Sequence, residues 1–251
     1  MSGWVVGAGV VGAALGSFLN VCVHRWPLDQ SVVSPRSRCP GCERPIAGYD
    51  NIPVLSWLLL RGRCRGCGER ISVRYPLVEL AVAAIWAGSV CWLGPRFEAV
   101  RIATFLTILL GIALTDARHY LIPDEFTLGG LVLGLAAAAV PGGFAPARAA
   151  LGAIVGFAFL WAIAVLGEKA FRKPAMGGGD IKMMAMVGAF LGVQGVFLTI
   201  FLGALFGALI FGPISMRTGK LVPFGIFLAM GAAVAAIWGP AVVEWYISTF
   251  L

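Results

Sequence analysis

The chain has 251 residues, of which 59% are hydrophobic and only 12% charged, and its mean hydropathy is +0.90. This composition excludes a soluble globular domain, because several apolar runs reach the roughly 20 residues that a helix needs to cross a bilayer. We interpret the net charge of +7 as a topology signal and as affinity for anionic lipid headgroups. Nucleic acid is not expected as a partner, because the basic residues are not interleaved with aromatic ones.

The first apolar run, residues 4–23, predicts a transmembrane helix whose N-terminus lies outside. No basic residue precedes the run, and His24 and Arg25 follow it, which argues against a cleaved signal peptide. Gly12 and Gly16 have the small-xxx-small spacing that lets membrane helices pack closely.

Residues 25–74 are predicted to form a soluble insertion, because they contain nine arginines and many prolines and glycines. Two C-x-x-C pairs lie in it, separated by 21 residues, close to the spacing of a four-thiolate zinc ribbon. Two disulfides or a redox pair are the alternatives, but a cytosolic location disfavours disulfides. A closed four-thiolate site predicts a structural zinc that folds a segment too short to build a large core. The four cysteines are Cys39, Cys42, Cys64 and Cys67.

Seven more apolar segments predict further helices, which gives about eight transmembrane helices in an all-α polytopic membrane protein. The long run 181–211 is interpreted as two helices, because Gln194-Gly195 is its only polar break. With the N-terminus outside, 16 of the 19 Lys and Arg residues lie inside, which also puts the C-terminus outside. The seven predicted helices are 75–93, 97–115, 126–140, 149–166, 181–193, 196–211 and 223–246.

We divide the chain into transmembrane helix 1 (1–24), a cytoplasmic four-cysteine domain (25–74), transmembrane helix 2 (75–96) and a membrane-embedded domain (97–251). Glu79, one turn into the second helix, is expected to complement the helix dipole.

Two acidic residues fall on the same, inner side of this arrangement. Asp116 ends the predicted helix 97–115, and Asp180 follows three glycines just before the apolar run 181–211. Ionisable groups at the membrane edge are costly and usually functional, and glycines allow close backbone approach to a ligand. The alternative is that Asp180 caps the next helix while the glycines make a turn. The supporting glycines are Gly177, Gly178 and Gly179.

Two carboxylates that meet in a low-dielectric site cannot both ionise cheaply, so they share one proton. The ionised member can take a proton from water while the other donates a hydrogen bond to the scissile carbonyl. This is the chemistry of aspartic proteases, and it requires the two groups to approach within a few ångströms. Asp124 and Glu125, by contrast, are interpreted as N-cap and first-turn acids of the helix that follows them.

Several motifs together resemble those of the type IV prepilin peptidases, and the resemblance covers nearly the whole chain. Two of them carry the acids: Asp116 followed by Leu121-Ile122-Pro123-Asp124, and Gly177-Gly178-Gly179-Asp180, whose aspartate lies 64 residues after Asp116. The others are Gly16-Ser17-Phe18-Leu19-Asn20-Val21, the paired C-x-x-C motifs and Pro53-Val54-Leu55-Ser56-Trp57-Leu58.

The resemblance implies an enzyme of the bacterial inner membrane that removes the basic leader of type IV prepilins and pseudopilins after a glycine, on the cytoplasmic side. It implies Asp116 and Asp180 as the catalytic pair and the four cysteines as the zinc site. Longer family members also N-methylate the new N-terminus with S-adenosylmethionine. Gly62 and Arg63 fall in the segment associated with methylation, where the family commonly has lysine in place of Arg63.

A basic leader must dock near a face that is itself basic. We hypothesise that a local negative patch receives it, formed by Asp124 and Glu125 with Glu43, Asp50 and Glu69 nearby. Two other classes of function stay open at this point. One is an ion-coupled transporter with a zinc-ribbon accessory domain, and the other is a membrane scaffold whose acids are structural.

Overall fold

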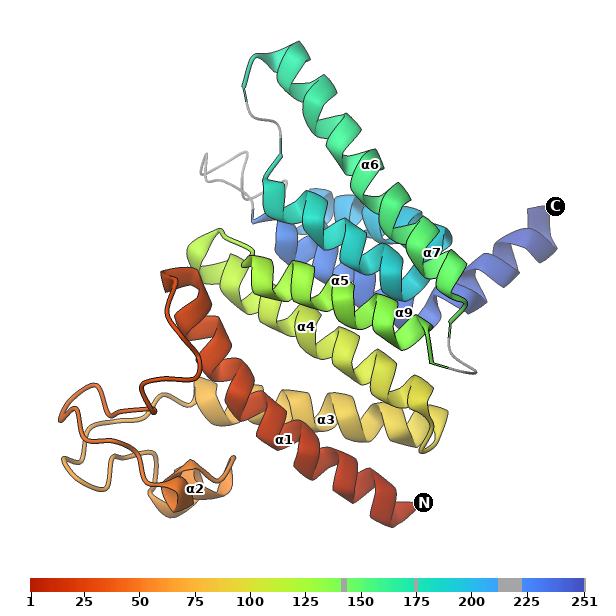
Figure 1. The fold of residues 1–251 in the computed structure, drawn as a ribbon. Helices are drawn as coiled ribbons and strands as arrows, with labels where there is room; N and C mark the ends of the chain where they lie inside the picture. The colour runs from red at the N-terminus through yellow and green to blue at the C-terminus, as the bar shows by residue number, and fades with distance from the viewer. Residues whose placement is uncertain (141–143, 174–175, 212–222, 251) are drawn as a thin grey trace. The chain divides into compact units, whose positions relative to one another are not determined.

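A computed structural model describes residues 1–140, 144–173, 176–211 and 223–250. The chain forms two compact units, Met1–Thr107 and Ile108–Leu251. The described part is helical, and its only β-type pairings are two isolated bridges. The elements labelled in Figure 1, with the short 3-10 and π-helices, are α1 (Ser2–Arg25), η1 (Trp26–Leu28), η2 (Gly48–Asn51), α2 (Leu55–Leu59), α3 (Arg74–Leu93), α4 (Phe97–His119), α5 (Asp124–Ala138), α6 (Pro146–Phe171), α7 (Gly178–Phe206), η3 (Gly207–Phe211) and α9 (Phe224–Phe250).

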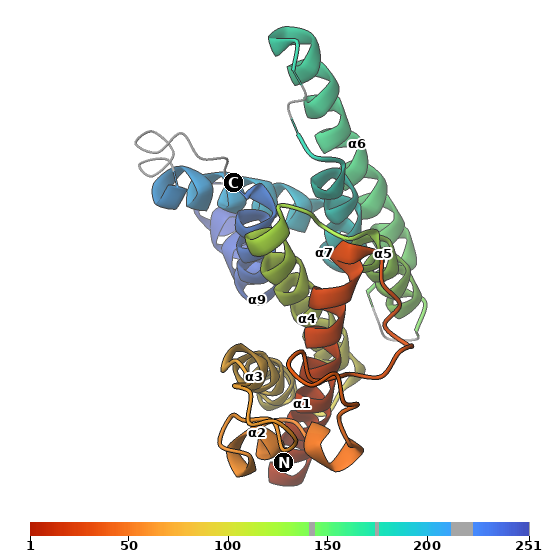
Figure 2. The same ribbon diagram turned by 90° about the vertical axis from the view of Figure 1, so that its left-hand side faces the viewer.

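In the first unit, α1 and α3 pack along each other, as Figures 1 and 2 both show. Gly12 and Gly16 make this contact close. A Cβ atom on Gly12 would lie 2.7 Å from the Val82 carbonyl oxygen, and one on Gly16 would lie 2.7 Å from the Glu79 Cα. The close packing expected from the spacing of the two glycines is therefore confirmed, and α3 is the partner.

In the second unit, α7 is the central element and contacts α5, α6 and α9. Its first half is buried on nearly every side, from Ile181 to Phe190. Two glycines of α6, Gly152 and Gly156, lie directly against the α7 backbone at Gly188 and Met184, with no room for a Cβ at either. A helix that is apolar all round and tightly surrounded can hold its polar first turn in a fixed position.

The helix α7 is broken once, at Gly192, whose φ of 70° and ψ of −174° are not helical. This backbone conformation is essentially restricted to glycine. The sequence predicted two helices with the break at Gln194-Gly195. The presence of a break is confirmed, but it lies two residues earlier than predicted. The first half of α7, from Asp180 to Gly192, is about 18 Å long at 1.5 Å per residue, well short of a bilayer's hydrocarbon thickness.

Five helices in the described part are long and apolar enough to cross a membrane: Ser2–Leu28, Arg74–Leu93, Phe97–His119, Pro146–Phe171 and Gly178–Ile210. The apolar stretch Phe224–Gly239 is shorter. The predicted count of eight is therefore not confirmed. The helix α5 has only 15 residues, the two halves of α7 count as one helix, and the apolar stretch of α9 is too short to be counted. Residues 213–222, whose Arg217 and Lys220 are among the basic residues predicted to lie inside, fall outside the described residues.

Candidate active site and cysteine cluster

Asp116 lies in the last turn of α4, because this helix continues to His119 and does not end at residue 115 as predicted. Its side chain is only 5% exposed. The backbone N–H of Ile226 donates a hydrogen bond to its Oδ2 at 3.0 Å, and the N–H of Gly225 is a second donor to the carboxylate. Both amides belong to the first turn of α9, where N–H groups have no acceptor within the helix. The Asp116 carboxylate therefore binds the start of another helix.

Asp180 is the third residue of α7, which begins at Gly178. The N–H of Gly177, the N-cap residue, donates to its carboxylate, as the acid of a capping box does. The alternative interpretation of Asp180 is thus partly correct, because this residue helps to start the helix. Its Oδ1 atom, however, is buried and has no hydrogen-bond partner in the part of the chain that the structure describes. Such an atom costs free energy unless a proton or a ligand satisfies it.

Ile122 lies between the segments that carry the two acids. A Cβ atom on Gly179, next to Asp180, would lie 2.9 Å from the Ile122 Cβ, and one on Gly225 would lie 2.7 Å from the Ile122 Cδ1. The two carboxylates are close enough to interact electrostatically. The end of α4, the start of α7 and the start of α9 therefore converge at one place, and they bring together two acids that are remote in sequence.

Asp124 has a different environment from the one predicted. It is the first residue of α5, Pro123 occupies the N-cap position, and no side chain caps this helix. Both carboxylate oxygens accept hydrogen bonds from Lys182 Nζ at 2.7 Å. The N-cap interpretation is therefore wrong, although the residue is a first-turn acid as expected. Glu125 is exposed beside it.

The four predicted zinc ligands form one cluster. The Sγ atoms of Cys39, Cys42, Cys64 and Cys67 all lie within 4.8 Å of one another, and that of Cys39 is 3.6 Å from that of Cys67. Four sulfurs at 2.3 Å from a tetrahedral zinc ion would be about 3.8 Å apart, so the residues fit a closed zinc site. The N–H groups of Cys67 and Gly66 lower the pKa of the Cys64 thiol to about 7. Against the N–H of Glu69, burial and the neighbouring thiols raise the pKa of the Cys67 thiol to about 12.

The two cysteine loops have the same backbone structure. In each, the N–H of the first cysteine donates to the carbonyl five residues later, and its carbonyl accepts from the N–H four residues later, at 2.8 to 3.0 Å. An isolated bridge closes each loop, Arg38 with Pro45 in the first and Arg63 with Arg70 in the second. The cluster is therefore built from two equivalent halves, each of which presents two thiols to the same point.

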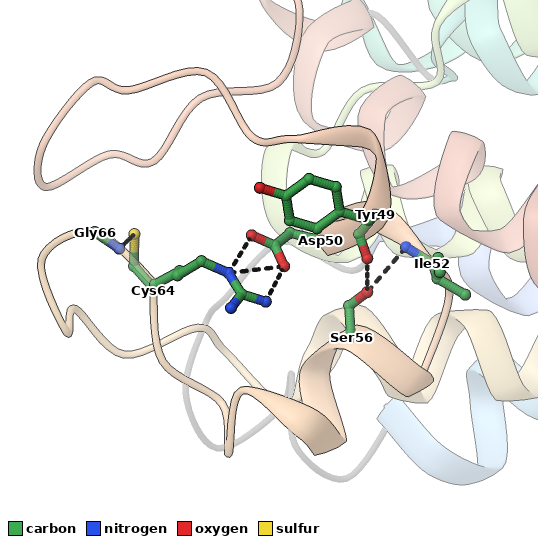
Figure 3. A network of polar contacts seen from close by, with 7 residues as sticks. Tyr49, Asp50, Ile52, Ser56, Cys64 and Gly66 are labelled. Carbon is green, nitrogen blue, oxygen red and sulfur yellow. Dashed lines mark hydrogen bonds and ion pairs between the residues drawn. The ribbon is translucent and has the colours of Figure 1, made fainter.

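A polar network ties the second cysteine loop to the 3-10 helix η2 (Figure 3). Arg65 contacts the carboxylate of Asp50 through two nitrogens, at 2.9 and 2.6 Å, and this hydrogen bonding lowers the pKa of Asp50 below its ordinary value. The Ser56 hydroxyl donates to the Tyr49 carbonyl and accepts from the Ile52 N–H, both at 3.0 Å. Asp50, one of the acids assigned to the predicted negative patch, is therefore already paired with a cation.

Of the two residues in the predicted methylation segment, one is buried and one exposed. Gly62 has a φ of 66°, and a Cβ on it would lie 2.9 Å from the indole ring of Trp57. Trp57 Nε1 in turn donates to the Ile71 carbonyl at 3.0 Å. Arg63 is exposed. Gly62 thus allows the turn to pack on Trp57, which is a structural reason for glycine there.

Comparison with known proteins assigns both units to one family. Residues 10–93 match the Bacterial Peptidase A24 N-terminal domain, and residues 103–212 match the Type IV leader peptidase family. A prepilin leader peptidase/N-methyltransferase of Aeromonas hydrophila is 36% identical over 94% of this chain and 91% of its own length.

This chain belongs to the type IV leader peptidase family.

Other relatives of the same name support the assignment. The protein from Myxococcus xanthus is 43% identical over 89% of this chain, which covers 63% of that relative's length. The protein from Bacillus subtilis is 35% identical over 96% of this chain and 97% of its own length. No solved structure matches the chain.

Sequence reasoning missed three participants at this family member's acidic site. Gly225 and Ile226 act through backbone N–H groups, which leave no side-chain signal in the sequence. Lys182 follows the glycine-aspartate motif by two residues, and its pairing with Asp124 could have been considered from opposite charge alone.

Proposed function

We propose that the chain is a membrane-embedded aspartic peptidase in which Asp116 and Asp180 are the catalytic pair. It removes the basic leader from type IV prepilins by cleavage after a glycine. The observation that supports this most directly is the convergence of buried Asp116 and half-buried Asp180 from remote segments. A buried carboxylate oxygen of Asp180 has no hydrogen-bond partner among the described residues. The family assignment and the names of the relatives agree with it.

The chemistry follows from two carboxyl groups that share one proton. The ionised carboxylate removes a proton from a water molecule, whose oxygen attacks the carbonyl carbon of the scissile peptide. The protonated partner donates a hydrogen bond to the carbonyl oxygen, on which negative charge develops. Collapse of the tetrahedral intermediate breaks the C–N bond, and the leaving nitrogen takes a proton from the pair. The products are the leader, with a carboxyl-terminal glycine, and the mature protein with a free amino terminus.

The proposal places the cleavage at the cytoplasmic face of a bacterial inner membrane, in a multi-pass protein with both termini outside. The bias of basic residues toward one side supports this orientation. Pseudopilins of type II secretion belong to the same substrate class, and membrane lipids surround the apolar helices. The four cysteines hold a structural zinc, which takes no part in the peptidase chemistry.

N-methylation of the new amino terminus is included in the proposal, because the relatives carry both activities in their name. S-adenosylmethionine would supply the methyl group when bound, and Gly62 and Arg63 belong to the segment assigned to this activity. The packing of Gly62 on Trp57 marks a structural turn and not a cofactor cradle. No methyl-transfer step is therefore derived from these residues.

Nothing among the comparisons or the described residues supports an ion-coupled transporter, and a scaffold would not need a buried carboxylate oxygen that lacks a partner among the described residues. The decisive experiment incubates the purified protein with a prepilin, with and without S-adenosylmethionine. Asp116→Asn and Asp180→Asn should each abolish leader removal and keep the fold, while the exposed Asp29→Asn should cleave like the wild type. Normal cleavage by either active-site variant would exclude the proposed pair.

A further inference from the structure

The two acids of the proposed catalytic pair have unequal surroundings. Asp116 is 5% exposed, and Ile226 and Gly225 donate backbone N–H groups to its carboxylate, the first at 3.0 Å to Oδ2. Asp180 receives the N–H of Gly177, and its Oδ1 has no partner among the described residues. One acid is therefore held by the start of a helix from another part of the chain, and the other has one buried oxygen without a partner in the described part of the chain.

The start of α9 fits closely around Asp116. A Cβ atom on Gly225 would lie 2.9 Å from the Asp116 Oδ2 and 2.7 Å from the Ile122 Cδ1. Only a residue without a side chain brings the first turn of α9 this near. The first N–H groups of a helix lack internal acceptors and carry partial positive charge, so they favour an anion beside them.

The opposite holds for Asp180. A carboxylate oxygen that is buried without a partner is costly when charged, and less so when the carboxyl group carries a proton. Hydrogen bonds to the charged form favour that form, and burial disfavours it. The surroundings therefore favour the charged form of Asp116 and the protonated form of Asp180, although both are carboxyl groups.

We infer that the first turn of α9, through the N–H groups of Gly225 and Ile226, fixes Asp116 as the ionised member of the pair and leaves the shared proton on Asp180. Asp116 is then the base that takes the proton from water, and Asp180 is the acid that hydrogen-bonds the scissile carbonyl. Gly225 and Ile226 are positioning residues for the reaction. This inference rests on the proposed peptidase function and assigns the two roles within it.

Other charged groups near Asp116 do not reproduce this asymmetry. The charge of Asp116 acts on Asp180 of α7, and α9 has no titratable residue from Phe224 to Gly239. Lys182 and Asp124 neutralise each other as an ion pair. The remaining titratable or charged groups on the neighbouring segments are Arg118 and His119 on α4 itself, Tyr120 after it, and Glu125 on α5.

The test removes the N–H group of Ile226 from the start of α9. Ile226→Pro deletes a donor to Asp116, and proline is tolerated in the first turn of a helix. Phe224→Pro is the matched control, because it leaves the N–H groups of Gly225 and Ile226 in place. The measurement is the pH profile of kcat/KM for prepilin cleavage, whose acidic limb reports the base of the free enzyme.

We expect the acidic limb of Ile226→Pro to move to higher pH by about one unit, a roughly tenfold lower kcat/KM on that limb at a given pH. The acidic limb of the pH profile of Phe224→Pro should coincide with that of the wild type. If Ile226→Pro does not fold, replacement of Ile226 by its α-hydroxy acid removes the same N–H without a ring, and the same change at Phe224 is its control. Identical profiles for the Ile226 and Phe224 variants would overturn the inference.

A second readout does not use the substrate. A small apolar epoxide reacts with an ionised carboxylate: the oxygen attacks an epoxide carbon, the ring C–O bond opens, and the alkoxide takes a proton from water. Mass spectrometry should find the resulting ester on Asp116. An ester on Asp180 alone would overturn the inference. Failure of the wild type to cleave prepilin would instead reject the proposed function, so the two failures can be distinguished.

Discussion

The carboxylate of Glu79 on α3 accepts a hydrogen bond from the backbone N–H of Val54, with Oε2 2.7 Å from the nitrogen. Glu79 is 8% exposed, and Val54 has a φ of 62° and a ψ of −50°. This conformation is strained for a β-branched residue. The N–H of Leu55 closes the turn by donating to the Pro53 carbonyl at 2.6 Å. Glu79 thus ties the segment that carries the cysteines to a membrane helix.

The first prediction concerns this hydrogen bond. Glu79→Ala should destabilise the first unit by about 1–3 kcal/mol, because the partly buried N–H of Val54 loses its acceptor. In a Val54→Gly background the loss should be smaller, because glycine adopts the turn without strain. Amide hydrogen exchange at Val54 and thermal unfolding measure both effects, with Leu80→Ala on the same helix as the control. Unchanged exchange at Val54 in Glu79→Ala would contradict this account.

The second prediction concerns the cysteine cluster. Purified protein should contain one zinc ion per chain, and a chelator should remove it and make residues 25–74 sensitive to protease, because metal binding supplies much of the folding free energy of small metal domains. Cys39→Ser should have the same effect. Cys91→Ser, which lies outside the cluster, should keep the zinc. Protease resistance without metal would show that the segment folds on its own.

The third prediction concerns leader binding. Because Asp124 is paired with Lys182, its negative charge is partly neutralised, and Glu125 is the more available acid. Glu125→Gln should therefore raise KM for a basic leader more than Asp124→Asn does, and neither should change KM for a leader with neutralised charges. The Lys182 pair is partly exposed, so its loss should cost only about 0.2–1 kcal/mol of stability. Equal KM changes for basic and neutral leaders would count against the negative patch.

The fourth prediction concerns the contact between α6 and α7. Gly188→Val should destabilise the second unit strongly, because a side chain there overlaps the backbone of Gly152. Gly129→Val on α5 is the control, because nothing lies within 4 Å of a Cβ at that position. Thermal unfolding in detergent compares the two. Equal melting temperatures would mean that α6 and α7 separate at little cost.

The presence of long apolar helices could be predicted because an apolar run is a local property of the sequence, but their number could not. The cysteine cluster could be predicted because its spacing defines two loops. The role of Glu79 could not, since its partner is a backbone N–H 25 residues away; the dipole explanation fails because α3 begins at Arg74 and Glu79 is not in its first turn. The contact of Ile226 with Asp116 spans 110 residues and involves no side chain on one partner. The helix break could be predicted only approximately, since Gly192 and Gly195 are equally able to make it and packing selects one.

The two cysteine loops have the same hydrogen bonds but differ in the conformational free energy of one residue. At the position after the second cysteine, one loop has Glu43 with a φ of 57°, and the other has Gly68 with a φ of 75°. A left-handed conformation costs an ordinary residue roughly 1–2 kcal/mol but is nearly free for glycine. The half that contains Gly68 is therefore the better pre-organised chelator. We expect a metal ion to bind first to the loop that contains Gly68 and then to the loop that contains Glu43. The domain would then fold from its carboxyl-terminal side.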